Sequence, residues 1–287
     1  MQEEKSTYGI IGYPIEHSLS PVMHNAVFYE LGVDAAYKLF PLKENELKIF
    51  FEDLRDPASP IFGLNVTIPY KEKVIEYLDV LSPFAKQTMA VNTIVVDEDR
   101  KLIGHNTDGP GFLAHLAELS LDLKDKRIAI LGAGGTTRSM LAAICLLPGK
   151  PHSVLLYNRT ISRAEELLQD LTQRINMESV EVVETPLDLN IELADVLINT
   201  TSLGLRPDDP CPLDPDALHS NLFVYDVIYH PKETKLLKLA KMKKAKTANG
   251  LGMLFYQGVL ALQHWAGIEL DDRVKQVMRK SLEAAGR

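Results

Sequence analysis

Residues 126–138 constrain the fold more than any other part of the sequence. A short apolar run, Arg127 to Leu131, leads into a glycine loop and then into a helical pattern that starts at Thr136. Glycine lets the backbone turn tightly and approach a pyrophosphate, whose charge the N–H groups and dipole of the helix start stabilise. The segment therefore predicts a Rossmann-type dinucleotide site and nicotinamide-dependent redox chemistry. The expected phosphate ligands are Gly132, Ala133, Gly134, Gly135 and Thr136.

One position in this segment departs from the usual dinucleotide fingerprint. A complete fingerprint has glycine or alanine where this chain has Thr137. The last small residue of the motif allows close packing of the helix on the strand. We therefore expect slightly looser packing at Thr137.

A second strand in the same block indicates which dinucleotide binds. Residues 154–157 are predicted to be a strand, and Asn158-Arg159-Thr160 follows it. NAD enzymes usually carry an acidic residue here for the ribose 2′-hydroxyl. Arg159 and Arg163 can instead bind a 2′-phosphate through charge-assisted hydrogen bonds. NADP is therefore favoured over NAD. Thr160 as a helix cap beside exposed arginines is the simpler alternative.

Length and charge narrow the class of protein. At roughly 150 residues per domain, 287 residues predict two domains. The net charge of -8 argues against nucleic-acid binding. The only basic cluster, five lysines between positions 238 and 246, is expected to be the solvated face of a helix. Residues 140–147, the longest apolar stretch, are far short of the roughly 20 residues that span a bilayer. Cys145 and Cys211 lack metal-binding spacing. We expect no metal, no membrane partner and a cytoplasmic location.

Alternating strand and helix patterns predict α/β architecture with largely parallel sheets. Residues 1–109, completed by C-terminal helices in 251–287, are expected to form a substrate-binding catalytic domain. Residues 110–250 are expected to form a Rossmann NADP-binding domain, with a cleft between the two. The predicted strands are residues 8–12, 36–41, 63–67, 92–96, 101–105, 127–131, 154–157, 180–183, 196–199 and 223–226. The predicted helices include residues 21–31, 44–54, 111–121, 251–265 and 271–284.

Three segments in the first block carry reactive groups at element ends. In Ser18-Leu19-Ser20-Pro21, Ser20 is a natural N-cap, and the two hydroxyls also form a carboxylate cradle. Lys71 is predicted in the first turn of a helix, where the helix dipole disfavours its charged form and so favours proton transfer. Asp108 follows a hairpin and opens a helix. Taken alone, each segment also fits a cap or a surface residue.

These segments occur in the order and of the type seen in one family. The sequence resembles shikimate dehydrogenases of the aromatic amino-acid pathway from Gly9 to the C-terminal helices. The resemblance rests on the glycine loop with Arg138, and on Ser18-Leu19-Ser20-Pro21, Asn65-Val66-Thr67-Ile68-Pro69-Tyr70-Lys71, Val91-Asn92-Thr93, Asn106-Thr107-Asp108-Gly109, Asn158-Arg159-Thr160, Asp226-Val227-Ile228-Tyr229-His230-Pro231 and Gly250-Leu251-Gly252-Met253-Leu254-Phe255-Tyr256-Gln257.

The resemblance implies reversible reduction of 3-dehydroshikimate to shikimate by NADPH, a step of chorismate biosynthesis. It implies that Lys71 transfers the proton and that Asp108 orients it. The substrate ligands implied are Ser18, Ser20, Thr67, Asn92, Asp108, Tyr229 and Gln257. The cofactor ligands implied beyond the glycine loop are Asn158, Arg159, Thr160, Arg163, Thr200, Val227 and Gly250.

Three alternative functions stay open at this point. A dual quinate/shikimate dehydrogenase differs by one ring hydroxyl, which small changes in pocket shape can accept or refuse. A regulator that binds NADP and shikimate-like ligands without turnover has no need of both Lys71 and Asp108. A thioester-forming reductase needs a nucleophilic cysteine on the substrate side, where this chain has none. Association into a homodimer is a further open alternative.

Overall fold

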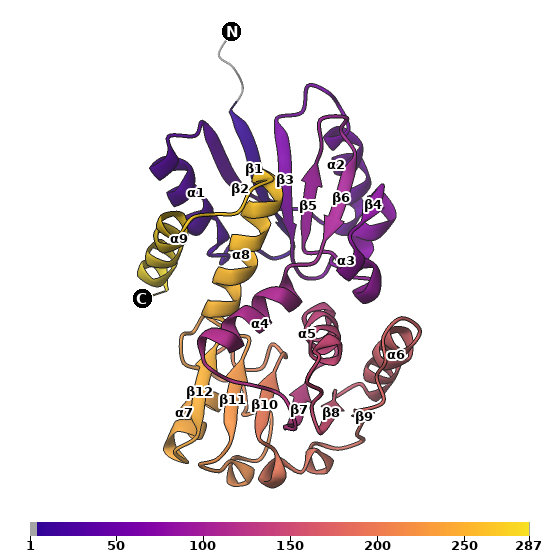
Figure 1. Cartoon of the computed structure of the whole chain (residues 1–287), viewed down its shortest axis with the longest axis vertical. Helices are drawn as coiled ribbons and strands as arrows, with labels where there is room; N and C mark the ends of the chain where they lie inside the picture. The colour runs from indigo at the N-terminus through magenta and orange to yellow at the C-terminus, as the bar shows by residue number, and fades with distance from the viewer. Residues whose placement is uncertain (1–4, 287) are drawn as a thin grey trace. The chain divides into compact units, whose positions relative to one another are not determined.

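The computed structural model describes residues 5–286, and the chain divides into two compact α/β units (Figure 1). Unit 1 comprises Met1–Gly111 and Leu254–Arg287, and unit 2 comprises Phe112–Met253. The chain thus returns to unit 1 after completing unit 2. This architecture confirms the α/β fold class predicted from the alternating patterns.

Unit 1 contains a six-stranded mixed sheet in the order β2-β1-β3-β5-β6-β4. β1 pairs in parallel with β2 and β3, whereas β5 runs antiparallel to both β3 and β6. The antiparallel β5–β6 pair confirms the hairpin predicted across residues 97–100. The strands are β1 (Ser6–Gly12), β2 (Ala35–Pro41), β3 (Ile61–Val66), β4 (Val80–Leu81), β5 (Thr93–Val96) and β6 (Leu102–His105).

Helices cover both faces of this sheet. On one face, Phe51 of α2 belongs to a buried cluster with Leu64 and Ile94 of the sheet. On the other face, Trp265 of α8 packs against Gly63, where a Cβ would lie 2.4 Å from the indole ring. The Trp265 Nε1–H donates to the Ile94 carbonyl at 3.0 Å. The helical segments are α1 (Ser20–Leu31), η1 (Glu44–Glu46), α2 (Leu47–Leu54), η2 (Lys73–Tyr77), α3 (Pro83–Thr88), α8 (Leu251–Ala266) and α9 (Asp272–Ala285).

Unit 2 contains a fully parallel six-stranded sheet in the order β12-β11-β10-β7-β8-β9. The chain moves outward from β7 to β9 on one side, and then from β10 to β12 on the other. Ligands of open parallel sheets bind at such a switch point, beside the carboxyl ends of the two central strands. The strands are β7 (Arg127–Leu131), β8 (Ser153–Tyr157), β9 (Val180–Val182), β10 (Val196–Asn199), β11 (Phe223–Asp226) and β12 (Lys246–Asn249).

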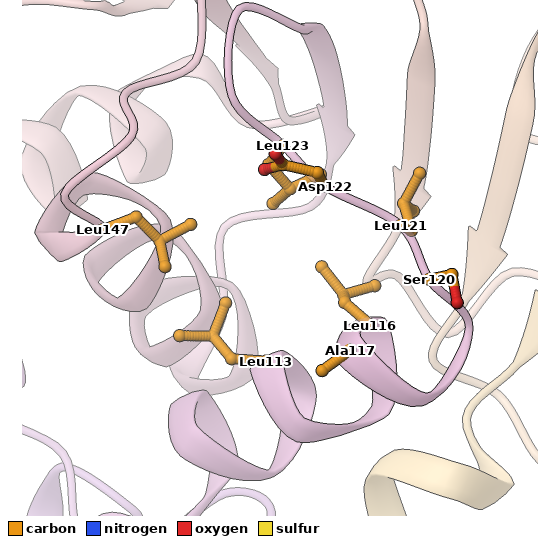
Figure 2. Close-up of a pocket in the computed structure, with 8 residues that line it drawn as sticks. All are labelled: Leu113, Leu116, Ala117, Ser120, Leu121, Asp122, Leu123 and Leu147. Atoms are coloured by element: carbon orange, nitrogen blue, oxygen red, sulfur yellow. The ribbon is translucent and has the colours of Figure 1, made fainter.

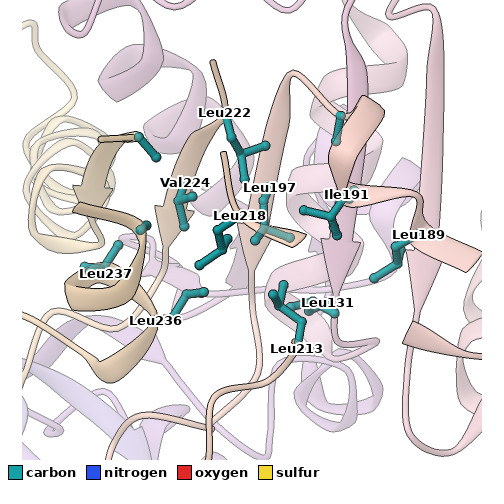
Figure 3. Close-up of a cluster of buried hydrophobic side chains, with 14 of the residues drawn as sticks. Leu131, Leu189, Ile191, Leu197, Leu213, Leu218, Leu222, Val224, Leu236 and Leu237 are labelled. Atoms are coloured by element: carbon teal, nitrogen blue, oxygen red, sulfur yellow. The ribbon is translucent and has the colours of Figure 1, made fainter. Parts of the chain in front are cut away.

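Successive residues of these strands supply two cores. Leu197 and Val224 lie in a leucine-rich cluster with Leu236 of α7 (Figure 3). Tyr225, the next residue along β11, instead contacts Phe112 of α4 edge to face, with ring centroids 5.2 Å apart. Burial on both faces is typical of parallel sheets. The helical segments of this part are α4 (Asp108–Glu118), α5 (Gly135–Leu146), α6 (Ile161–Thr172), η3 (Pro186–Leu189), η4 (Ile191–Leu193), η5 (Pro215–Ala217) and α7 (Lys235–Met242).

The predicted elements are largely confirmed, with differences at short segments. The helix predicted over residues 44–54 is split into η1 and α2. The lysines between 238 and 246 are exposed as expected, but only Lys238 and Lys241 lie on a helix, because α7 ends at Met242. Lys243 and Lys244 lie in the turn that follows, and Lys246 lies in β12. That strand escaped prediction because Lys246-Thr247-Ala248-Asn249 lacks the apolar residues of the other parallel strands.

Candidate active site and cofactor site

The carboxyl ends of β1 and β3 bring two loops of unit 1 together. The Thr67 N–H donates to the Ile11 carbonyl at 2.9 Å, and the Tyr13 N–H donates to the Ile68 carbonyl at 3.1 Å. A Cβ at Gly12 would lie 2.5 Å from the Thr67 methyl, so only glycine permits this approach. The loop that carries Ser18 is thereby fixed against the loop that carries Thr67 and Lys71.

The two serines lie at the start of α1, but Ser20 is not the cap that the sequence suggested. The helix begins at Ser20 and its N-cap is Leu19, because the Leu19 carbonyl accepts the Met23 N–H at 3.4 Å. Ser18 Oγ accepts the Ser20 N–H at 3.3 Å. Ser20 is buried and Ser18 half-buried. The hydroxyl that holds the first turn is therefore that of Ser18, two residues before the expected Ser20, and the N-cap lies one residue earlier than expected.

Lys71 and Asp108 form the closest charged contact of the site. Lys71 Nζ lies 2.6 Å from Asp108 Oδ2, and their side chains are only 11% and 7% exposed. Asp108 is the first residue of α4, so it opens a helix as expected, but the helix starts three residues before the predicted range 111–121. Lys71 is not in the first turn of a helix: it lies in a turn before η2, and its carbonyl accepts the Val91 N–H at 2.7 Å. The Ile75 N–H, which would bond the Lys71 carbonyl in an α-helix, donates instead to the Glu72 carbonyl at 3.4 Å.

Asn92 holds the far side of the Asp108 carboxylate. Its Nδ2 donates to Asp108 Oδ1 at 2.8 Å, to Thr107 Oγ1 at 2.9 Å and to Gln257 Oε1 at 3.4 Å. The Thr107 N–H donates back to Asn92 Oδ1 at 2.7 Å. Gln257, on α8, thus joins the site from the C-terminal part of the chain. The structure brings together four residues that the sequence predicted separately: Lys71, Asp108, Asn92 and Gln257.

A buried amide beneath these residues was missed as a site component. Asn65 Nδ2 donates to the Asn92 carbonyl at 3.1 Å and to Thr93 Oγ1 at 3.2 Å, and Asn65 Oδ1 accepts the Tyr37 hydroxyl at 2.7 Å. The signal in the sequence was the polar residue at position 65 within the apolar run of β3. A buried asparagine in a central strand requires partners, and here its partners position Asn92.

The glycine loop of unit 2 lies at the switch point between β7 and β10. Gly132 has a φ of +107°, and a Cβ there would lie 2.5 Å from Thr200 Oγ1. A Cβ at Gly134 would meet nothing within 4 Å, so the backbone at that point is open to a ligand. α5 starts at Gly135, one residue before the expected start. The loop thus has the exposed backbone and the helix start that a pyrophosphate requires.

The expectation of looser packing at Thr137 is wrong. Thr137 is fully buried. Its hydroxyl accepts the Gly134 N–H at 3.1 Å and lies 2.7 Å from Thr200 Oγ1. Thr200, after β10, donates to the Leu131 carbonyl at 2.6 Å. Hydrogen bonding thus compensates for the larger side chain.

Arg159 and Arg163 extend into solvent beyond the end of β8. Both are exposed, and neither forms an ion pair with a carboxylate within residues 5–286. Thr160 is the N-cap of α6 by position, but its side chain accepts no cap hydrogen bond. Asn158 Nδ2 donates to the Thr160 carbonyl at 2.7 Å and orders the turn between them. The arginines are therefore available to an anionic ligand.

The ends of β11 and β12 meet at Gly250. A Cβ on Gly250 would lie 1.9 Å from the Val227 carbonyl oxygen, so no other residue fits without displacing the backbone.

Asp226, the last residue of β11, is fully buried. It accepts hydrogen bonds from Asn199 Nδ2 at 3.1 Å, the Ile228 N–H at 3.1 Å and the Thr234 hydroxyl at 2.7 Å. Burial nevertheless raises the pKa of Asp226 to about 6, against the opposing effect of these bonds.

A separate cavity of about 410 Å³ lies in unit 2 and contains none of the predicted site residues (Figure 2). It is lined mainly by leucines of α4 and of the segment that precedes β7, together with Leu147.

Tyr229 of unit 2 lies after β11 and is half-buried. Across residues 5–286 no group of three or more His, Cys, Asp or Glu side chains could hold a metal ion, and no helix is long and apolar enough to cross a membrane.

Known proteins with the same sequence pattern identify the family. A model of the shikimate dehydrogenase substrate binding domain matches residues 10–94, and a shikimate / quinate 5-dehydrogenase model matches residues 115–204. The shikimate dehydrogenase (NADP(+)) of Methanocaldococcus jannaschii is 41% identical over 264 residues, 91% of each chain. The chain belongs to the shikimate dehydrogenase family.

Solved structures of shikimate dehydrogenase relatives have the same fold. The enzyme from Aquifex aeolicus superposes with a TM-score of 0.87 at 39% identity, covering 98% of this chain and 99% of that one. Quinate dehydrogenase from Corynebacterium glutamicum, in complex with NAD, superposes with a TM-score of 0.86 at 30% identity, with 98% and 99% coverage. The fold is therefore shared by relatives named as shikimate dehydrogenase and as quinate dehydrogenase.

Proposed function

We propose that this chain is an NADP-dependent shikimate dehydrogenase that reversibly reduces 3-dehydroshikimate to shikimate. The observation that carries the proposal is the enclosed contact of 2.6 Å between Lys71 Nζ and Asp108 Oδ2. A dehydrogenase must move one proton to or from the substrate oxygen, and a lysine ammonium held by a carboxylate can do this. Chorismate biosynthesis, and with it aromatic amino-acid formation, is the pathway in which this reaction belongs.

Lys71 donates the proton in the reducing direction. NADPH, when bound, would supply the hydride that the reduction requires. The Lys71 ammonium delivers a proton to the carbonyl oxygen as charge develops on it. Asp108 holds the lysine through Oδ2, while Asn92 holds Asp108 through Oδ1. In the oxidising direction neutral Lys71 accepts the hydroxyl proton. The pair thus sets the position of the transferring group.

The remaining polar residues of unit 1 suit a hydroxylated ring with a carboxylate. Ser18 and Ser20 would bind the carboxylate, together with Tyr229 of unit 2. Thr67, Asn92 and Gln257 would bind ring hydroxyls; Asn92 and Gln257 already lie within hydrogen-bond reach of each other. In this proposal residues 1–109 with 251–287 form the substrate-binding catalytic domain.

The residues of unit 2 fit NADP. The open backbone at Gly134 and the start of α5 would take the pyrophosphate, and the exposed Arg159 and Arg163 would take the 2′-phosphate. Thr200, Val227 and Gly250 follow the ends of β10, β11 and β12, on the same sheet edge as the loop. In this proposal residues 110–250 form the cofactor domain.

A grid of steady-state rates tests the proposal against the quinate alternative, which the similarity to quinate dehydrogenase raises. Shikimate and quinate are each assayed with NADP and with NAD by nicotinamide absorbance. We expect the highest kcat/KM for shikimate with NADP. A higher kcat/KM for quinate would make this chain a quinate dehydrogenase, and absence of turnover with all four pairs would favour a ligand-binding regulator.

Replacement of Lys71 tests its role in proton transfer. Lys71→Ala should lower kcat by about 10² to 10⁴, the usual contribution of acid/base catalysis. Lys73→Ala is the matched control, because Lys73 is two residues away and forms a surface ion pair with Glu44. The role is wrong if the Lys71 variant turns over at the parent rate.

Replacement of Arg159 tests cofactor choice. Arg159→Ala should raise the Kd of NADP at least tenfold, because losing one charge-assisted hydrogen bond costs on the order of a factor of ten in affinity. The Kd of NAD, which has no 2′-phosphate, should change little. Arg127→Ala is the control, because Arg127 is exposed at the amino end of β7. Equal losses for both cofactors would refute a contact with the 2′-phosphate.

Two further proposals are tested separately. Sedimentation of the purified protein tests whether it forms a homodimer, and fractionation of cells tests its cytoplasmic location.

A further inference from the structure

The buried hydroxyl of Thr137 has a definite place in a chain of hydrogen bonds. Thr200 must donate to the Leu131 carbonyl, because a carbonyl has no proton to give. The single hydroxyl proton of Thr200 is then used, so Thr137 donates to Thr200 Oγ1 at 2.7 Å. Thr137 in turn accepts the Gly134 N–H at 3.1 Å. The bonds therefore run in one direction: Gly134 N–H, Thr137, Thr200, Leu131 carbonyl.

This hydroxyl chain joins the two ends of the glycine loop. Leu131 is the last residue of β7 and Gly134 the last residue before α5, so Gly132 and Ala133 lie between the two ends of the hydroxyl chain. The Thr200 N–H also donates to the Leu131 carbonyl at 2.8 Å, and the Gly132 N–H donates to the Tyr157 carbonyl at 2.8 Å. The Thr137 bond is the part of this anchoring supplied by α5 itself.

We propose that Thr137 is a positioning residue for NADP binding, which holds the glycine loop in its phosphate-accepting conformation through Gly134 and Thr200. This inference rests on the proposed function, since it concerns the same cofactor. A loop already fixed before binding loses less conformational entropy when the pyrophosphate arrives. The larger residue at the last small position of the fingerprint thus supplies a bond that glycine or alanine cannot.

Thr137→Val tests the inference, because valine keeps the shape and removes only the hydroxyl. One neutral hydrogen bond corresponds to about 3- to 10-fold in affinity, so the Kd of NADP and that of NAD should both rise by that factor. Binding is measured by calorimetry, independently of turnover. The KM of NADP should rise in step, while kcat at saturation and the KM of shikimate stay at parent values. Thr137→Ser, which retains the hydroxyl, should bind within about twofold of the parent.

Two further variants separate the hydroxyl chain from general stability. Thr172→Val is the matched control, since its hydroxyl bonds the Leu168 carbonyl on α6, and it should bind NADP as the parent does. In a cycle with Thr200→Val, the double variant should bind about as weakly as Thr137→Val alone if the two hydroxyls act as one unit. Thr200→Val alone removes the next bond of the hydroxyl chain, and it supplies the test if Thr137→Val is poorly stable.

Several results would overturn the inference. If Thr137→Val binds NADP as tightly as the parent, or more tightly because the Gly134 N–H then reaches the phosphate, the hydroxyl does not position the loop for binding. The same holds if Thr137→Ser is as weak as the valine variant. Failure of the proposed function is recognised separately, because the parent would then fail to oxidise shikimate with NADP even though its cofactor Kd is measurable.

Discussion

Asp226 should make the stability of this protein depend on pH in an unusual direction. Its pKa rises from 3.8 to about 6 because burial disfavours the carboxylate, although Thr234, Ile228 and Asn199 donate to it. A carboxyl with a raised pKa binds its proton more tightly in the folded state than in the unfolded state. Its contribution to stability is therefore complete below pH 3.8 and is lost as pH rises through 6.

The magnitude follows from the two pKa values. Moving from 3.8 to about 6 corresponds to about 3 kcal/mol between the fully protonated and fully ionised limits. Over a practical range, from pH 8 to pH 5, the expected gain is about 1.4 kcal/mol. Asp226→Asn removes the titration and keeps the size of the side chain. The free energy of unfolding of the parent minus that of the variant should therefore increase by this amount as pH falls.

Chemical denaturation at several pH values measures this difference, and subtraction removes the titration of all other groups. Asp208→Asn serves as the control, because Asp208 is an exposed aspartate of the same unit. Thr234→Val gives a second test, since loss of a donor to the carboxylate should move the transition to higher pH. A difference between parent and Asp226→Asn that is constant from pH 5 to pH 8 would refute the reasoning.

Three further predictions concern both units. Gly250→Ala should abolish the rise in melting temperature that NADP produces, because the added methyl group would lie 1.9 Å from the Val227 carbonyl oxygen and displace the backbone of the proposed cofactor site. A rise equal to that of the parent would contradict this. Lowering the pH from 7.5 to 4.5 should stabilise His24→Phe by about 3 kcal/mol relative to the parent, because burial lowers the pKa of His24 from 6.5 to about 3 and the folded parent keeps its imidazole neutral; denaturation at both pH values measures the change. Tyr37→Phe should cost about 1 to 3 kcal/mol in denaturation experiments because Asn65 loses a buried donor, and an unchanged midpoint would exclude this.

The sequence predicted the strands of unit 2 well because parallel strands are apolar on both faces. The bounds of β7, β10 and β11 agree with the predicted ranges to the residue. β4, with two residues, and α3, with six, are too short for periodicity to detect. β12 was missed because its residues are polar or small and half-buried, so that only its pairing with β11 defines it as a strand.

The site residues were found through local motifs and family resemblance, while their contacts depend on distant parts of the chain. Asp108 Oδ2 contacts a lysine 37 positions earlier, and Asn92 reaches Gln257 across 165 positions. No local pattern specifies such distances. The role of Asn65 was likewise hidden, because a polar residue in β3 acquires a meaning only when the strand lies beside Asn92.

The local argument that placed Lys71 in the candidate site was wrong, although Lys71 does contact Asp108 there. A helix start was expected to favour proton transfer by Lys71, but its carbonyl accepts the Val91 N–H and the chain turns without forming that helix. The position of the ammonium is instead fixed by two long-range constraints, the Val91 bond on its backbone and the Asp108 contact on its side chain. Both partners flank β5 and β6. The hairpin, rather than a helix dipole, therefore determines where the proton is held.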